Sequence, residues 1–105
     1  MALPRTPSFR LDGRRALVTG ASRGIGLGAA VALAEAGAHV VMSARGTGAL
    51  GEAVAAMGAA GLSAEAAPCD VTDVGAVADL VARHGPFDVL VNSAGTTRPG
   101  PALET

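Results

Sequence analysis

The sequence predicts an α/β fold in which a doubly wound, parallel sheet carries helices on both of its faces. Three observations support it, of which the first is the alternation of short apolar runs with Ala-rich segments of helical length, in the order βαβαβαβ. The second is a glycine-rich turn, residues 19–26, between the first apolar run and the first long helix. The third is Val89-Leu90-Val91, a continuous apolar run that is typical of a strand covered on both faces. Right-handed crossovers then predict the strand order 3-2-1-4.

The first unit is a strand over residues 15–19, the glycine turn, and a helix over residues 24–36. Gly20 lets the chain leave the strand in a tight turn, and Gly26 lets the helix lie close to the sheet. Gly24 has no Cβ, so the backbone there can approach a pyrophosphate, and the free N–H groups of the first helical turn favour an anion. The alternative is an ordinary strand–helix turn, which glycine spacing alone does not exclude.

The second unit is a strand over residues 39–43 followed by a helix over residues 47–60. Gly37 separates this strand from the preceding helix, as a C-cap glycine does. Thr47 is the expected N-cap of the second helix, and Gly61 is its expected stop. Glycines inside this helix weaken it, so the sequence defines its ends less sharply.

The third unit begins with a strand expected over residues 63–68 from its place in the alternation, because its Ala content is a poor strand signal. Either Thr72 or Asp73 begins the next helix, which we expect to end at His84. Four apolar residues at helical spacing predict the buried face of this helix: Val74, Val77, Leu80 and Val81. The last strand is expected over residues 88–92.

Length, charge and cysteine content limit the class of protein. The 105 residues suffice for one small domain, which we expect over residues 11–105 after a flexible tail of residues 1–10. A net charge of −1 favours neither nucleic acid nor an anionic membrane as a partner. The apolar stretch of residues 25–42 is interrupted by polar and glycine residues, and we expect neither a membrane span nor a signal peptide. A single cysteine cannot form an internal disulfide, which favours a cytoplasmic protein.

Three reactive side chains are interpreted as structural. Cys69 is expected to be a small buried residue, and the neighbouring Asp70 carboxylate should raise the pKa of its thiol. His39 lies at the start of a predicted strand and His84 at the end of a predicted helix. Neither histidine has a metal-ligand partner at useful spacing, so we expect no metal site.

Three motifs share the order and spacing of one protein family: Thr19-Gly20-x-x-x-Gly24-x-Gly26, Asp70-Val71 and Asn92-Ser93-Ala94-Gly95. From about Leu11 to its end, the chain resembles the classical short-chain dehydrogenases/reductases. The resemblance implies a partial Rossmann-type fold and hydride transfer between a nicotinamide dinucleotide and a small-molecule carbonyl/alcohol substrate. It also implies that full-length members form homo-oligomers.

The resemblance assigns cofactor contacts to individual residues. In the glycine turn these are Gly20, Ser22, Arg23, Gly24, Ile25 and Gly26. The Asp70 carboxylate is expected to accept a hydrogen bond from the adenine amino group, with the Val71 backbone alongside. The residues themselves leave an alternative open, in which Asp70 and Asp73 only favour the positive end of the third helix.

The end of the last strand is the third place of contact. The resemblance implies that Asn92 binds the cofactor and ties neighbouring strands together. Ala94 and Gly95 are small enough to leave room for the ribose and nicotinamide. Ser93 stands where the family usually has a second Asn, and we assign no contact to its shorter side chain. The alternative is a strand-end turn without a cofactor role.

The end of the second strand decides which dinucleotide binds, because NAD-specific sites place an acid there for the ribose 2′-hydroxyl. No carboxylate occurs between Glu35 and Glu52, and Arg45 stands at this place. Arg45 could pair with a 2′-phosphate, and Arg23 could reach the same group. Each charged hydrogen bond contributes about 1.5–3 kcal/mol, which predicts NADP(H) in preference to NAD(H). The alternative is that both arginines are solvated surface residues.

Members of the family use a Tyr as acid/base, a Lys four residues later and an upstream Ser, which the resemblance places beyond this chain. The sequence contains no Tyr and no Lys, so we expect no catalytic residue in it and no activity from it alone. The chain is therefore interpreted as the cofactor-binding half of an oxidoreductase, as a fragment or an incomplete gene model. The alternatives are a complete, non-catalytic nucleotide-binding module and a flavodoxin-like or signalling domain without a dinucleotide.

Overall fold

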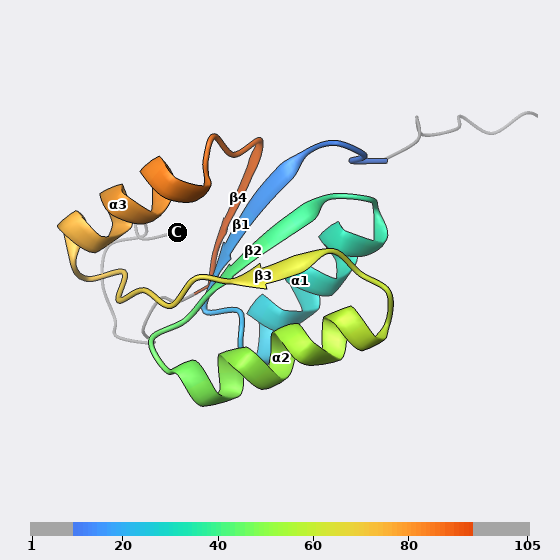
Figure 1. The fold of residues 1–105 in the computed structure, drawn as a ribbon, viewed down its shortest axis with the longest axis horizontal. Coiled ribbons are helices and arrows are strands. Elements are labelled where there is room, and N and C mark those ends of the chain that lie inside the picture. The colour runs from blue at the N-terminus through green and yellow to red at the C-terminus, as the bar shows by residue number, and fades with distance from the viewer. Residues whose placement is uncertain (1–9, 94–105) are drawn as a thin grey trace, which may run out of the picture.

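A computed structural model describes residues 10–93, in which strands and helices alternate along the chain (Figure 1). The elements are β1 (Arg15–Thr19), α1 (Gly24–Glu35), β2 (His39–Ser43), α2 (Thr47–Ala59), β3 (Ala64–Ala66), α3 (Val74–His84) and β4 (Val89–Asn92). The four strands are parallel and ordered β3-β2-β1-β4, so the predicted fold class and strand order are confirmed. Ala94, Gly95 and most of the expected tail lie outside the described residues.

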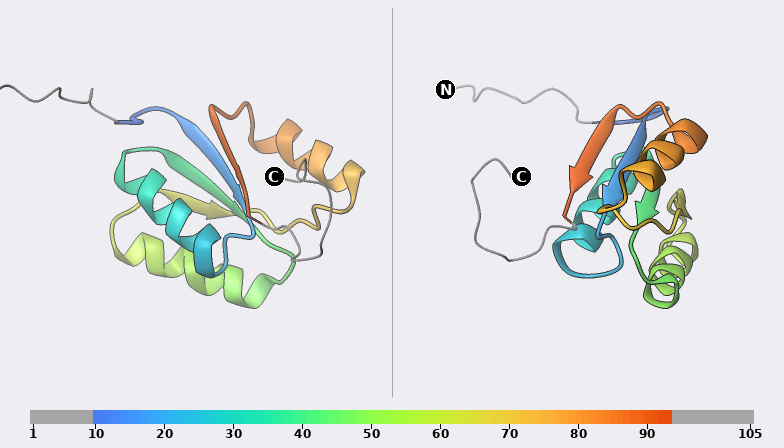
Figure 2. Two further views of the ribbon diagram at one scale, coloured as in Figure 1. Left: turned by 180° about the vertical axis from the view of Figure 1, so that it is seen from behind. Right: turned by 90° about the vertical axis from the view of Figure 1, so that its left-hand side faces the viewer.

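Helices cover both faces of the sheet, as Figures 1 and 2 show from three sides. Alternate residues of the strands point to opposite faces. One face carries Ala16, Val18, Val40 and Met42 and packs against α1 and α2. On the other face, Leu17 and Val41 pack with Leu80 of α3.

The third unit departs from prediction in two places. β3 is shorter than expected, although the N–H groups of Ala67 and Cys69 still donate to the carbonyl oxygens of Met42 and Ala44, so single hydrogen bonds to the end of β2 continue past the strand. The buried face of α3 is also narrower than expected: Leu80 is buried, but Val74 is 81% exposed and Val81 is exposed as well. The expectation for these two valines is wrong, since α3 packs on this face of the sheet through Ala76, Val77 and Leu80.

One of the two N-caps expected for α3 is found in the structure, and the N-cap expected for α2 is not. Asp73 is the N-cap of α3, and its side chain accepts a hydrogen bond from the N–H of Ala76 at 3.1 Å. In α2 the N-cap is Gly46, and Thr47 is the first helical residue. The expectation that Thr47 caps this helix is therefore wrong, and no side chain caps α2 among the described residues.

β4 forms one edge of the sheet within residues 10–93. Its Val89 and Val91 pack against the cluster under α1. Leu90 pairs in register with Leu17 on the other face, but it is 66% exposed because α3 does not extend over it. Within the described residues, this strand is therefore not covered on both faces. None of the helices in the described part combines the length and apolar character that a membrane crossing requires.

Candidate functional site

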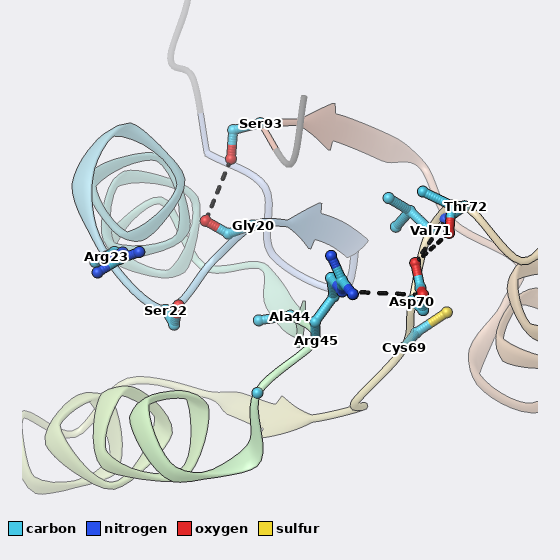
Figure 3. Close-up of a pocket in the computed structure, with 11 residues that line it drawn as sticks. Gly20, Ser22, Arg23, Ala44, Arg45, Cys69, Asp70, Val71, Thr72 and Ser93 are labelled. Carbon is cyan, nitrogen blue, oxygen red and sulfur yellow. Dashed lines mark hydrogen bonds and ion pairs between the residues drawn. The ribbon is translucent and has the colours of Figure 1, made fainter. Parts of the chain in front are cut away.

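A cavity of about 470 Å³ lies at the carboxyl edge of the sheet (Figure 3). Its lining comes from the glycine turn, the ends of β2 and β4 and the segment after β3. The lining residues are Gly20, Ser22, Arg23, Ala44, Arg45, Gly46, Cys69, Asp70, Val71, Thr72 and Ser93. The structure thus brings six predicted site residues to one cavity: Gly20, Ser22, Arg23, Arg45, Asp70 and Val71. Gly24, Ile25, Gly26 and Asn92 lie next to it in the chain but do not line it.

The glycine turn has the backbone that its sequence predicts. Gly20 and Gly24 have φ values of 63° and 62°, a left-handed conformation that favours glycine. The N–H of Ala21 donates to the carbonyl oxygen of Ser43 at 3.0 Å, which ties the turn to the end of β2. Its close connection to β2 explains why the turn and Arg45 share one cavity.

Gly26 brings the first turn of α1 close to Gly20 and Ser93. A Cβ at this position would collide with the Gly20 carbonyl oxygen and with the Ser93 hydroxyl. That hydroxyl donates to the Thr19 carbonyl oxygen at 2.6 Å. Ser93 therefore ties the end of β4 to the start of the turn, a role that sequence reasoning missed because it links segments far apart in the chain.

The N-terminus of α1 is open. Arg23 occupies the N-cap position without a side-chain cap hydrogen bond, and no acidic residue lies in the first turn. Ile25, in the same turn, is exposed. The backbone N–H groups of this turn therefore have no side-chain acceptor from the described residues and can receive an anion.

Asp70 faces the cavity with one carboxylate oxygen already engaged. Its Oδ1 accepts hydrogen bonds from the N–H and the hydroxyl of Thr72, at 2.9 and 2.6 Å. Thr72, first through its hydroxyl and then through its N–H, holds the pKa of Asp70 below the ordinary value, and Arg45 adds to this effect. This contact of Thr72 was missed by sequence reasoning, although an Asp side chain often accepts a hydrogen bond from the backbone N–H two residues on. Since Asp73 caps α3, the helix-entry role applies to Asp73.

The two cavity arginines are placed differently (Figure 3). The Arg45 guanidinium is turned toward Asp70, with Nε 3.9 Å from Oδ2. Arg23 lies on the α1 side of the cavity, and it makes no ion pair with any carboxylate in the described residues. The expectation that both arginines serve one phosphate remains a prediction.

Asn92 ties two strands together, as the family resemblance implies. Its Oδ1 accepts a hydrogen bond from the Thr19 hydroxyl at 2.9 Å, which joins β4 to β1. This side-chain bond adds to the backbone pairing of the two strands at Thr19 and Asn92.

The remaining reactive side chains have structural surroundings. Cys69 is buried, and burial raises the pKa of its thiol, with a further contribution from Asp70 and Asp73. His39 Nε2 lies 2.9 Å and His84 Nδ1 lies 3.7 Å from the same Glu65 oxygen. Hydrogen bonding to His39 is the main reason why the pKa of Glu65 is below its ordinary value.

A parallel sheet in the order β3-β2-β1-β4 with a glycine turn and a cavity at its carboxyl edge is the architecture of nucleotide-binding α/β proteins. Residues 14–105 match the family model of the short chain dehydrogenases. The chain therefore belongs to the short-chain dehydrogenase family, whose members are oxidoreductases.

Two curated relatives are similar over most of this chain. The 2-keto-3-deoxy-L-fuconate dehydrogenase of Xanthomonas campestris is 43% identical over 104 residues, which span 99% of this chain and 33% of that protein. The gluconate 5-dehydrogenase of Gluconobacter oxydans is 50% identical over 100 residues, which span 91% of this chain and 39% of that protein. The chain thus spans between a third and two fifths of these relatives.

Solved structures share the fold. A hydroxysteroid dehydrogenase from Escherichia coli superimposes with a TM-score of 0.79 at 37% identity, over 90% of this chain and 42% of that one. A 3-oxoacyl (acyl-carrier-protein) reductase from Agrobacterium tumefaciens C58, solved with NADP bound, gives a TM-score of 0.78 at 37% identity. This second match covers 93% of this chain and 39% of that one.

Proposed function

We propose that this chain is the dinucleotide-binding part of an oxidoreductase that transfers hydride between NADP(H) and a carbonyl/alcohol substrate. One observation carries the proposal: the glycine turn, the end of β2 and Asp70 line a single cavity at the carboxyl edge of the sheet. A dinucleotide needs these three places for its pyrophosphate, its adenosine ribose and its adenine.

The glycine turn fits a pyrophosphate. The first turn of α1 has no side-chain cap, and the space where a Gly24 Cβ would lie is open. Arg23 and Ser22 line the same wall of the cavity. Backbone N–H groups at a helix N-terminus favour an anion, and the positive charge of Arg23 adds to that preference.

Asp70 fits the adenine. An aspartate is ionised at neutral pH, and the Oδ1 of Asp70 is occupied by hydrogen bonds from Thr72. Oδ2 is therefore the oxygen that would accept from the adenine amino group, with Val71 alongside in the cavity wall.

Arg45 supports a preference for NADP(H) over NAD(H). It follows β2, where NAD-specific sites carry an acid, and its guanidinium lies in the cavity. A 2′-phosphate on the adenosine ribose would pair with this guanidinium. The bound NADP of the similar Agrobacterium reductase is consistent with this choice.

The nicotinamide supplies the hydride, and the residues of this chain bind and orient the dinucleotide. Asn92, Ala94 and Gly95 are proposed to lie beside the nicotinamide ribose. Since the chain contains no Tyr and no Lys, the proton-transfer pair of the family is proposed to belong to a part of the protein outside it. We further propose a cytoplasmic, homo-oligomeric enzyme with residues 11–105 in its cofactor domain.

Titration of the purified protein with NADPH and NADH tests the proposal. Arg45→Gln should weaken NADPH binding about tenfold or more without weakening NADH binding, because a charged hydrogen bond of roughly 1.5–3 kcal/mol to the 2′-phosphate is lost. Arg45→Asp should then move the preference toward NADH.

Arg83→Gln is the matched control, since Arg83 lies on α3 outside this cavity and pairs with Asp79. It should leave both affinities unchanged. If the folded protein binds neither dinucleotide, the proposed function is wrong. If the ratio of the Kd values for NADH and NADPH is unchanged in Arg45→Gln, Arg45 is not the residue that selects the cofactor.

A further inference from the structure

Arg45 and Asp70, two charged residues that line the cavity, form an ion pair with each other at the place proposed for the adenosine. Nε of Arg45 lies 3.9 Å from Oδ2 of Asp70, and Figure 3 shows the guanidinium turned toward the carboxylate. Under the proposed function, each of these groups has another partner: the 2′-phosphate for Arg45 and the adenine amino group for Asp70. The ion pair therefore occupies the Arg45 guanidinium that the 2′-phosphate would bind, and the Asp70 oxygen that the adenine amino group would bind.

The two partners differ in how firmly they are held. Asp70 is anchored, because its Oδ1 accepts two hydrogen bonds from Thr72. Arg45 is not anchored in this way: its side chain is 78% exposed, and Asp70 is its single ion-pair partner among residues 10–93. Arg45 is therefore the partner that can move, while Oδ2 of Asp70 stays in place.

We propose that the Arg45–Asp70 pair is a latch that a 2′-phosphate opens, so that recognition of the phosphate and recognition of the adenine are coupled. The inference rests on the proposed function. A 2′-phosphate draws the guanidinium away and leaves Oδ2 free for the adenine amino group. A dinucleotide without that phosphate leaves Arg45 in competition with adenine for the same oxygen. The two contacts then strengthen each other, since each is made more easily when the other is present.

Four ligands measure the coupling on the intact protein: NADPH, NADH and their hypoxanthine analogues, which carry an oxygen in place of the adenine amino group. The discrimination between bases is the Kd of the hypoxanthine form divided by the Kd of the adenine form. The latch predicts that this discrimination is about two- to fivefold larger with the 2′-phosphate than without it, the range for an exposed ion pair. The titrations belong at low ionic strength, because salt screens such a pair.

Two variants assign the coupling to the latch. Arg45→Gln should make the discrimination equal for the phosphorylated and unphosphorylated ligands, because nothing then competes for Asp70. Arg23→Gln is the matched control, since Arg23 lines the same cavity but has no ion pair with Asp70. It should weaken binding of all four ligands and keep the difference in discrimination.

The outcomes separate the latch from the proposed function. Equal discrimination in the unmodified protein overturns the latch and leaves dinucleotide binding intact, without relying on any variant. If Arg23→Gln abolishes the difference in base discrimination between the phosphorylated and unphosphorylated ligands, the coupling does not belong to the Arg45–Asp70 pair. Failure of the folded protein to bind any of the four ligands overturns the proposed function itself.

Discussion

α1 and α3 both begin at the carboxyl edge of the sheet, but their first turns are built in opposite ways. In α3 the side chain of Asp73 caps the helix. In α1 the N-cap residue, Arg23, supplies no cap, and Gly26 brings the helix against Gly20 and Ser93. α2 also begins without a side-chain cap, at Gly46, and Gly46 lines the same cavity as Arg23.

The contrast separates a helix start that is complete from one that is open. A side-chain cap satisfies one of the free N–H groups of the first helical turn and adds stability. An open N-terminus gives up that stability and leaves its N–H groups to an anionic ligand. In the described part of the chain, both uncapped helices begin on the cavity, which locates the place where binding would compensate for the missing caps.

The largest expected effect on stability comes from adding a Cβ at Gly26, where α1 lies against Gly20 and Ser93. Gly26→Ala should lower the free energy of unfolding by about 1–3 kcal/mol, because its Cβ overlaps backbone and the Ser93 hydroxyl. Gly75→Ala in the first turn of α3 is the matched control, since the nearest atom to its Cβ is Asp73 Oδ1 at 3.4 Å. This control should raise stability by about 0.5–1 kcal/mol. Urea unfolding measures both changes. Similar effects at the two glycines would mean that the first turn of α1 is not packed more tightly than that of α3.

Removing the cap of α3 should have a smaller effect that is confined to stability. Asp73→Ala should cost about 1 kcal/mol, because the N–H of Ala76 loses its acceptor. Asp73→Asn keeps a capping oxygen and should keep most of the stability. NADPH titration should give the same Kd for all three proteins. A weaker affinity in Asp73→Ala would mean that this helix start also serves the site.

A side-chain cap added to α1 should raise the stability of the protein and weaken its binding of NADPH. Arg23→Asp places an acceptor and a negative charge at the N-cap, and should raise the free energy of unfolding by about 0.5 kcal/mol. The same carboxylate repels a phosphate, so NADPH affinity should fall further than in Arg23→Gln. Thermal unfolding and NADPH titration of both variants provide the comparison. Stabilisation without weaker binding would show that this turn does not face the pyrophosphate.

The smallest effect concerns the segment between β3 and α3. Thr72→Val should raise the pKa of Asp70 toward its ordinary value, because the Thr72 hydroxyl is the main cause of the depression. A carboxylate with a depressed folded pKa contributes stability above its unfolded pKa and loses it as pH falls through the folded pKa. In Thr72→Val that contribution should therefore be smaller, and its loss should be complete at a higher pH. An NMR titration of the Asp70 carboxyl, with Thr72→Ser as control, measures the shift; identical curves for Val and Ser would contradict it.

Much of the fold follows from local patterns in the sequence. The Gly20 turn and the strand order are predicted correctly, and the cap Asp73 is one of the two residues expected at the start of α3. Each depends on near neighbours in the chain or on the handedness of crossovers. The exposure of Val74 is predicted wrongly, since helical spacing alone does not show how wide a stripe the sheet covers. The contact of Ser93 is missed, because its partner Thr19 is distant in sequence.

The sequence by itself determined the class of fold, the place of the glycine turn and the absence of an acid after the second strand. Periodicity, glycine positions and residue types express these properties over a few neighbouring residues. Only the tertiary structure decided that Arg45 faces Asp70, that Thr72 holds that carboxylate, and that Gly26 meets Ser93. Such meetings depend on the parallel register and on helix packing, which set the distances between segments that the chain itself keeps apart.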